Sequence, residues 1–336
     1  MHNLFLKNLF ICCLYVACTF THNPEYVYPV CCIQNKVLVV EQCEGQPELY
    51  AFDVQEMTYE KILSSHYVPS LIMPLPDNSG FSFLDDGRVR IKYFCKRGVR
   101  TIDIFEPIYA IGGLQWIDAH ACIFHAREGS HYGIYKMNID GEIEKVLHDD
   151  CYDFLYPQMD NAVLFYITHD HGMYAVWKCN AQCAHDRTLL IKNEKKSMMF
   201  LQVINDHELF YIEAPDNPRE HNFISFSFCH AWQEKDGAWQ NEKLFKFVVP
   251  NELLFDDEVR LYESILPLTP VYFEGNIYYS SAEKPHETMV AYRYDMIRRE
   301  SHAFLKVKEL EDCFGIICVP DKVFIGGKKL HSISYN

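Results

Sequence analysis

Short apolar runs that end in a polar turn residue recur along the chain. Four of them share one order (apolar, aromatic, any residue, apolar, then Asp or Asn), and they are Leu49–Asp53, Ile134–Asn138, Val176–Asn180 and Ala291–Asp295. Runs of this length are typical of β-strands, and the closing Asp or Asn predicts a turn whose backbone amides bond its side chain. The second and third runs lie 42 residues apart and the first and second 85, close to twice that. A strand-based period in this range predicts a repeat fold, above all a β-propeller.

The unit between residues 113 and 147 shows the repeat most clearly. Its predicted strands are Gly113–Ile117, Ala121–Ala126, Gly133–Ile139 and Glu142–Leu147. The dipeptide Asp140-Gly141 between the last two favours a tight hairpin, because both positions tolerate positive φ. Each unit is therefore expected to form one four-stranded antiparallel blade.

Seven such units fit the chain. They begin near Val27, Pro69, Gly113, Asp153, Met199, Ser264 and Asp312. Their second strands are predicted at Lys36–Glu41, Gly80–Leu84, Ala121–Ala126, Ala162–Thr168, Glu208–Glu213, Asn276–Ser281 and Lys322–Gly326. The long fifth interval holds an insertion, Pro250–Glu263, which fits a short helix or an extended loop over one rim.

The seventh unit reaches Asn336 without a fourth strand. A ring can be closed by a blade that takes strands from both chain ends, so the N-terminal stretch is one source of the missing strand. If the last residues instead complete the first blade, the count falls to six. We predict an all-β propeller of four-stranded blades, with seven blades favoured over six.

The clearest unit resembles a known repeat. Ile123–Ala126, Gly133–Gly141 and Val146-Leu147 are similar to the TolB-type, WD40-like propeller repeat, which has an apolar strand, an I-Y-x-M-D-x-D-G strand and turn, and a closing leucine. Pro76–Gly80 is a loose version of the turn that precedes that strand. The resemblance implies an exported propeller with an interaction role. The repeat also builds the propellers of prolyl-oligopeptidase and dipeptidyl-peptidase IV-type proteins, but this chain has no G-x-S-x-G nucleophile elbow.

Charge narrows the range of partners. With 31 basic and 46 acidic residues the formal net charge is −15, which repels phosphate backbones and disfavours nucleic acid. A local exception is the basic stretch Arg88–Arg100, in which Arg88, Arg90 and Lys92 alternate with apolar residues. That alternation predicts a half-buried strand with a solvated basic face. The alternative is docking on an acidic partner or on anionic lipid.

The N-terminus carries a targeting signal. Leu9–Ala17 is an uninterrupted apolar run after a basic start, which matches a signal-peptide core and is too short to span a bilayer. We therefore expect residues 1–21 to be a signal and residues 22–336 to be one propeller domain. Three fates stay open: simple secretion, lipidation of Cys18 as in a bacterial lipoprotein, or an uncleaved segment. The expected location is the periplasm or cell envelope.

Eleven cysteines follow the targeting segment, an odd number at irregular spacing that does not suggest a disulfide framework. Cys122, Cys179 and Cys318 lie inside apolar runs, where a free cysteine acts as a small hydrophobic residue. Two pairings remain open, namely Cys179 with Cys183 and Cys313 with Cys318.

Histidines and carboxylates give the strongest candidate chemistry. In His169-Asp170-His171, two imidazoles and a carboxylate on one turn suggest a metal site, but spacing supplies fewer ligands than a metal needs, and a polar hairpin turn explains them as well. His125 shares a strand face with Ile123, which predicts a hydrogen-bonded interior residue. We expect no bound cofactor.

Two tryptophans, Trp232 and Trp239, flank a Lys-Asp-Gly turn in the fifth unit. They suit a peptide- or glycan-binding rim, or equally strand-paired core positions. Together these features predict a monomeric, non-catalytic module that binds another protein. The alternative is a propeller enzyme, a hydrolase or lyase, with a metal or carboxylate site at the mouth of the channel.

Overall fold

The computed structural model describes residues 26–43, 46–64, 70–85, 88–94, 99–102, 108–181, 183–214, 223–250, 269–282, 289–303, 314–319, 322–326 and 330–334. Regular structure in these ranges consists of β-strands, without a helix. The same ranges accordingly hold no helix long and apolar enough to cross a membrane.

Six sheets have four strands each. Blade 1 comprises β1 (Tyr26–Ile33), β2 (Lys36–Cys43), β3 (Gln46–Asp53) and β4 (Thr58–Ser64). Blade 2 comprises β5 (Ser70–Pro74), β6 (Gly80–Asp85), β7 (Arg88–Tyr93) and β8 (Val99–Ile102). Blade 3 comprises β9 (Ile108–Trp116), β10 (Ala121–Glu128), β11 (His131–Asn138) and β12 (Ile143–Leu147).

The remaining sheets continue in chain order. Blade 4 comprises β13 (Asp153–Asp160), β14 (Val163–Asp170), β15 (Met173–Asn180) and β16 (Cys183–Asn193). Blade 5 comprises β17 (Ser197–Asn205), β18 (Glu208–Ala214), β19 (Phe223–Gln233) and β20 (Trp239–Pro250). Blade 6 comprises β21 (Val271–Phe273), β22 (Asn276–Ala282), β23 (Met289–Asp295) and β24 (Glu300–Ala303). A three-stranded seventh sheet comprises β25 (Phe314–Val319), β26 (Lys322–Gly326) and β27 (His331–Ser334).

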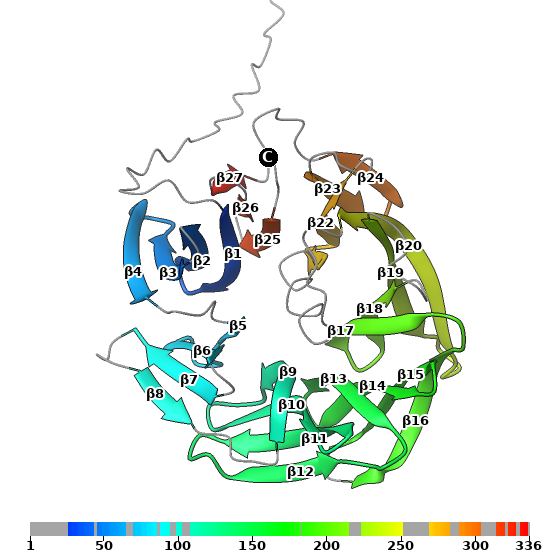
Figure 1. Ribbon diagram of the computed structural model, residues 1–336. Coiled ribbons are helices and arrows are strands. Elements are labelled where there is room, and N and C mark those ends of the chain that lie inside the picture. Colours follow the sequence, from blue (N-terminus) through cyan, green and yellow to red (C-terminus); the bar gives the residue numbers. More distant parts are fainter. Residues whose placement is uncertain are drawn as a thin grey trace, which may run out of the picture.

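The sheets form a ring (Figure 1). The first strands β1, β5, β9, β13 and β17 lie nearest its centre, and the fourth strands lie at its periphery. The first strands of blades 1 to 5 each contact the next one around the ring, blades 5 and 6 meet through β20 and β22, and β21 and β1 both contact β25 of the seventh sheet. The predicted β-propeller of four-stranded blades is confirmed.

Within the described residues, the first and last sheets of the ring share no strand, and residues 1–25, a predicted source of the missing strand, lie outside them. Strand β1 pairs within blade 1, and the seventh sheet pairs only β25, β26 and β27 among the described residues. Over that part of the chain, no strand from one end joins the blade at the other. Strand β1 lies next to β25 and β26, and Phe324 of β26 packs against Val27 and Phe52 of blade 1.

The second strands lie where the sequence places them, within two residues at either end. Most of their residues are apolar because both faces of these strands are buried, as in the first half of β14. Phe165 and Ile167 pack toward blade 5, and Leu164 and Tyr166 pack toward blade 3. A strand covered on both faces is expected to be a continuous apolar run, and this run is the repeat's most regular signal.

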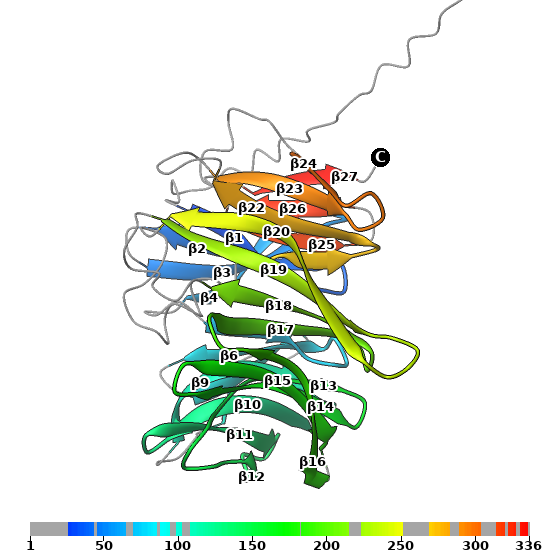
Figure 2. The same cartoon turned by 90° about the vertical axis from the view of Figure 1, so that its right-hand side faces the viewer.

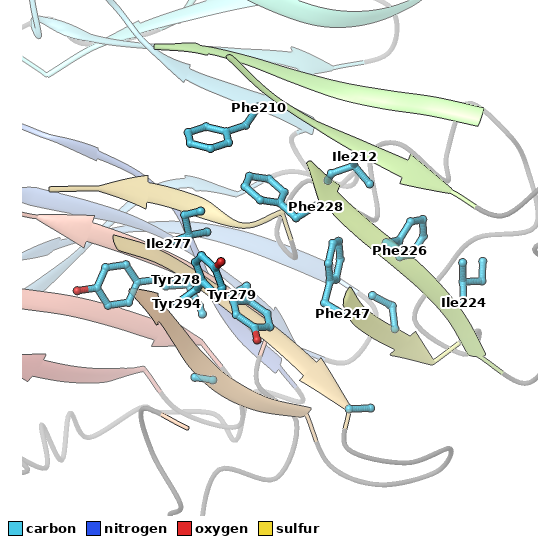
Figure 3. Packing of buried hydrophobic residues seen from close by; sticks show 14 of the residues in the cluster. Phe210, Ile212, Ile224, Phe226, Phe228, Phe247, Ile277, Tyr278, Tyr279 and Tyr294 are labelled. Carbon is cyan, nitrogen blue, oxygen red and sulfur yellow. The ribbon is translucent and has the colours of Figure 1, made fainter. Parts of the chain in front are cut away.

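Flat aromatic rings fill the space between blades 5 and 6 (Figure 3). The rings of Phe210 and Phe228 stack at 5.3 Å, and those of Phe228 and Phe245 at 5.4 Å. The ring of Phe245 continues the stack into blade 6, 4.1 Å from that of Tyr279. Such pairs add to the stabilisation from buried area, which explains the aromatic-rich composition.

The Asp or Asn that closes the repeated motif caps its turn, as predicted. The Asp53 carboxylate accepts hydrogen bonds from two turn amides, and so does that of Asp295. The Asn138 side chain accepts from the amides of Asp140 and Glu142. The Asp140-Gly141 turn is longer than the two-residue hairpin expected from the sequence, since it runs from Asn138 to Ile143. Gly141 alone of that pair has positive φ, at 91°.

The structure also tests the predictions about the basic strand and the cysteines. In β7, Val89 and Ile91 are fully buried and Arg88 is exposed, so the half-buried basic strand is confirmed. Cys122 and Cys179 are buried, and Cys179 has a free thiol, so its pairing with Cys183 was wrong. Cys313, the targeting segment with Cys18, and residues 251–263 of the insertion lie outside the described residues.

Antiparallel strands give the ring two different faces. The turns between second and third strands lie with the links between blades, on what we call the linker face. The turns within the first and last strand pairs of each blade lie on the opposite side, the turn face. In Figure 2 the β19–β20 and β23–β24 turns project from the turn face, at the right of the view.

Candidate functional site at the junction of blades 3 and 4

Histidine and carboxylate side chains gather on the linker face where blades 3 and 4 meet. The β10–β11 turn, the start of β13 and the β14–β15 turn supply them. These segments are distant in sequence, and the ring brings them together. The site contains the predicted His169, Asp170 and His171, and also groups that the sequence did not single out.

A buried histidine forms the floor of this site. His125 is 6% exposed, and its Nδ1 accepts a hydrogen bond of 3.2 Å from the backbone amide of Tyr156 in blade 4. A Cβ added to Gly112 would lie 2.6 Å from the His125 ring, so the glycine provides room for the imidazole. The neighbouring Gly113 has a φ of +57°, where a side chain would be strained. The interior, hydrogen-bonded His125 predicted from strand alternation is confirmed.

Burial decides the protonation state of His125. It lowers the pKa of the imidazole to about 3, although the negative charge of Asp153 opposes the shift. The ring is therefore neutral near pH 7. Because Nδ1 accepts the Tyr156 bond, the neutral ring carries its proton on Nε2.

Asp153 lies between two further histidines. Its Oδ1 is 3.5 Å from His131 Nδ1 and accepts a 2.8 Å hydrogen bond from the Tyr132 amide, and its Oδ2 is 3.5 Å from His169 Nδ1. Partial burial acts to raise the pKa of Asp153. The hydrogen bonds from His169 and the Tyr132 amide outweigh burial, so the pKa lies below its usual value.

The two predicted metal-ligand histidines face different carboxylates. His169 stacks on the Tyr174 ring at 4.4 Å, and its Nε2 accepts from the Gly172 amide at 3.2 Å. The side chain of His171 is 93% exposed and pairs with Asp170, which raises the pKa of His171 through a hydrogen bond and its charge. Among the described residues, no group of three or more His, Cys, Asp or Glu side chains is placed to hold a metal ion.

A second carboxylate, Glu128, lies at the end of β10. It accepts a 2.9 Å hydrogen bond from the Tyr135 hydroxyl and pairs with Lys145, and these two contacts lower its pKa. His148 Nε2 lies 3.6 Å from the same carboxylate. The sequence hinted at this cluster only through the density of histidines around residue 130.

The two candidate tryptophans lie at the other end of the fold, beside the β19–β20 turn. The Trp232 ring, half-buried, stacks on His230 at 5.0 Å. The Trp239 ring, also half-buried, packs on the core between blades 4 and 5, with the Lys178 ammonium 5.4 Å from its centre. Both rings combine core packing with partial exposure, and a binding rim at this position stays a prediction.

Comparison with known proteins supports the fold and does not extend to a sequence family. No protein-family model matches the chain, and no curated protein matches it significantly. Solved structures do match, at low identity. A puromycin-hydrolyzing peptidase from Mycobacterium tuberculosis has a TM-score of 0.63 at 11% identity, and the match covers 90% of this chain and 48% of the peptidase. The chain thus spans about half the length of that enzyme.

Two other solved structures match at similarly low identity. The Listeria monocytogenes protein lmo1340 has a TM-score of 0.53 at 12% identity, covering 93% of this chain and 95% of its own. TolB from Acinetobacter baumannii has a TM-score of 0.50 at 12% identity, covering 82% of this chain and 61% of its own. The chain therefore has a TolB-like β-propeller fold, which is also found in propeller-bearing peptidases. A shared fold at this identity leaves function to be argued from the site.

Proposed function

We propose that the chain is an exported, non-catalytic propeller that binds another protein through the turns on its rims. The supporting observation is that two turns share one hydrogen-bonded backbone arrangement but differ in the residues at their tips. The turns at Asp53 and Asp295 have the same capping hydrogen bonds, yet their tip residues are Gln55-Glu56 in one and Ile297-Arg298 in the other. Rigid frames that present unlike loops are typical of recognition scaffolds.

The apolar run Leu9–Ala17 supports export to the periplasm or cell envelope, and so does a fold of the kind found in TolB. The net charge of −15 supports a protein partner over nucleic acid. Lipidation of Cys18 would add a membrane anchor to the same module. The mass of the mature N-terminal peptide distinguishes lipidation from simple cleavage.

The test is isolation of the tagged full-length chain from its native cells after brief chemical cross-linking. The proposal expects one partner protein at a fixed ratio to the chain. Recovery of the chain alone, at the mass of a monomer, over a range of salt concentrations would contradict it.

One observation favours the enzyme alternative, namely the carboxylate of Asp153 between His131 and His169. A carboxylate paired with imidazoles can act as a general acid–base unit in a hydrolase or lyase. Asp153→Asn keeps the side chain's size and removes its charge. If the purified chain cleaves ester, peptide or uronate substrates and Asp153→Asn abolishes the cleavage, the enzyme function replaces the binding function.

A further inference from the structure

The β23–β24 turn carries the most exposed large apolar side chain among the described residues. Ile297 is 92% exposed, while the next two, Leu189 and Met173, are 44% and 39% exposed. The adjacent Arg298 side chain is 75% exposed. We call Ile297 and Arg298 the blade 6 tip.

The exposure of Ile297 belongs to an ordered turn. The Asp295 carboxylate accepts hydrogen bonds of 2.9 Å from the backbone amides of Ile297 and Arg298. The backbone carbonyl of Asp295 accepts another, of 2.8 Å, from the Arg299 amide. The Arg299 guanidinium makes two hydrogen bonds to Glu242 of blade 5, at 2.9 and 3.0 Å. These contacts hold the turn from both sides and leave the tip projecting.

Blade 1 provides an internal control, because it contains the same turn. The Asp53 carboxylate accepts hydrogen bonds from the amides of Gln55 and Glu56 at 2.9 and 3.1 Å. The backbone carbonyl of Asp53 accepts one from the Met57 amide at 2.9 Å. Met57 has a φ of 56° and Arg299, at the equivalent position, one of 59°. This turn forms with an exposed, polar Gln-Glu pair at its tip. The turn geometry therefore requires neither an apolar nor a basic tip, which leaves Ile297 and Arg298 available for a contact outside the chain.

The charge of the tip indicates what it contacts. Arg299 is engaged by Glu242, but Arg298 extends beyond the turn, its Nε 3.8 Å from Asp295. A basic group beside an apolar one on a protein of net charge −15 complements an apolar pocket with an acidic rim. An anionic membrane would face the wider surface of this acidic protein, which repels it, whereas a pocket can contact the basic tip alone.

We propose that the blade 6 tip is a docking point for a partner protein, with Ile297 entering an apolar pocket and Arg298 meeting carboxylates at its rim. This inference rests on the proposed protein-binding function and names the contact through which it acts. An apolar anchor flanked by a charge that selects its partner is a common arrangement at interfaces.

The experiment places a photo-crosslinking amino acid at position 297 of the full-length chain, and in a matched variant at position 55, in native cells. The proposal expects a single adduct from position 297 and none from position 55. The crosslinked peptide of the partner should contain apolar residues with Asp or Glu nearby. Equal adducts from both positions, or adducts to many proteins, would overturn the inference.

Affinity for the identified partner is then measured with the double variant Ile297→Gln, Arg298→Glu, which installs the blade 1 tip in blade 6. We expect its affinity to fall roughly a hundredfold, since both the apolar burial and the charge pairing are lost. The control Gln55→Ala, Glu56→Ala should change affinity less than about twofold. An unchanged melting temperature of the double variant is expected, because blade 1 forms the same turn with these residues.

Two outcomes distinguish failure of the docking point from failure of the proposed protein-binding function. If a partner binds and the double variant binds it equally well, the docking point is wrong and the protein-binding function stands. If no partner is found, both fail. Sedimentation with vesicles of phosphatidylcholine and phosphatidylglycerol tests the membrane alternative, and binding lost in the double variant would replace the protein partner with a lipid surface.

Discussion

Two junctions of the ring, between blades 3 and 4 and between blade 1 and the seventh sheet, differ in the chemistry of a buried histidine and a buried carboxyl group. At the first, His125 is 6% exposed and accepts a hydrogen bond from the next blade. At the second, Glu41 is 2% exposed, and its Oε1 has no hydrogen-bond partner among the described residues. A base and an acid are thus buried, and each is easiest to bury in its neutral form.

The second junction is the place where the first and last sheets of the ring meet. Its core consists of Val27, Val37, Val39 and Phe52 of blade 1 against Phe324 of the seventh sheet. Glu41 continues the face of β2 formed by Val37 and Val39, opposite Val27 of β1. An ionisable group therefore lies on the face of β2 that packs toward the seventh sheet.

The surroundings of Glu41 favour its protonated form. Burial raises its pKa to about 7, and the neighbouring carboxylate of Glu48 adds to the shift while Lys61 opposes it. Glu48 itself is held by the Tyr50 hydroxyl at 2.6 Å and by Lys61. The comparison predicts that the two junctions respond to pH in opposite directions.

The largest expected effect is acid destabilisation through His125. Its folded pKa of about 3 lies below its ordinary 6.5, so the unfolded chain binds this proton first as pH falls. The contribution of His125 to stability is complete above pH 6.5 and declines toward pH 3, by about 5 kcal/mol in all at about 1.4 kcal/mol per pH unit. Urea unfolding from pH 7 to 4 measures it.

The control for that prediction is His125→Asn, whose side-chain oxygen can accept the Tyr156 bond but does not titrate in this range. The variant should be less stable at pH 7 and show a flatter pH dependence below 6.5. An equally steep decline in the variant would assign the acid response to other groups.

The opposite response is expected from Glu41. Its folded pKa of about 7 lies above its ordinary 4.5, so its contribution is complete below pH 4.5 and is lost as pH rises through 7. Glu41→Gln keeps the shape and removes the titration. We expect the variant to be more stable than the parent by about 3 kcal/mol at pH 8 and equal to it at pH 4. A variant that is less stable at pH 8 would show that the carboxylate is favourably bound there.

A steric test addresses the same histidine. In Gly112→Ala the new methyl group meets the His125 ring at 2.6 Å, and crowding of this kind costs about 1–3 kcal/mol. Asparagine is smaller than histidine, so the penalty should shrink when Gly112→Ala is combined with His125→Asn. Unfolding free energies of the four proteins form a double-mutant cycle. If the two changes in unfolding free energy are strictly additive, the cost of Gly112→Ala does not come from contact with His125.

The sequence predicted the repeat and the interior His125 because both depend on local alternation. The second strands are apolar on both faces, and His125 shares a face with Ile123, so each can be inferred from neighbours in the chain. Glu41 could not be found this way. It follows Val40 near the end of an apolar run, where a polar residue is expected to be exposed, yet it is 2% exposed. The pairing of Asp153 with His131 likewise depends on how blades 3 and 4 meet, whereas His169 is its cross-strand partner within blade 4.

The smallest expected effect distinguishes structural from functional use of Asp153. Its folded pKa lies below the ordinary 3.8, so its contribution is present above that value and is lost as pH falls through the folded pKa. Asp153→Asn retains an oxygen for the Tyr132 amide and removes the charge that faces two half-exposed histidines, so a loss of about 1 kcal/mol or less is expected at pH 6. The difference between parent and variant should vanish in acid, as measured by urea unfolding from pH 6 to 3. A difference that persists at pH 3 would mean that the aspartate acts through shape rather than charge, and that the carboxylate between two imidazoles is part of the scaffold.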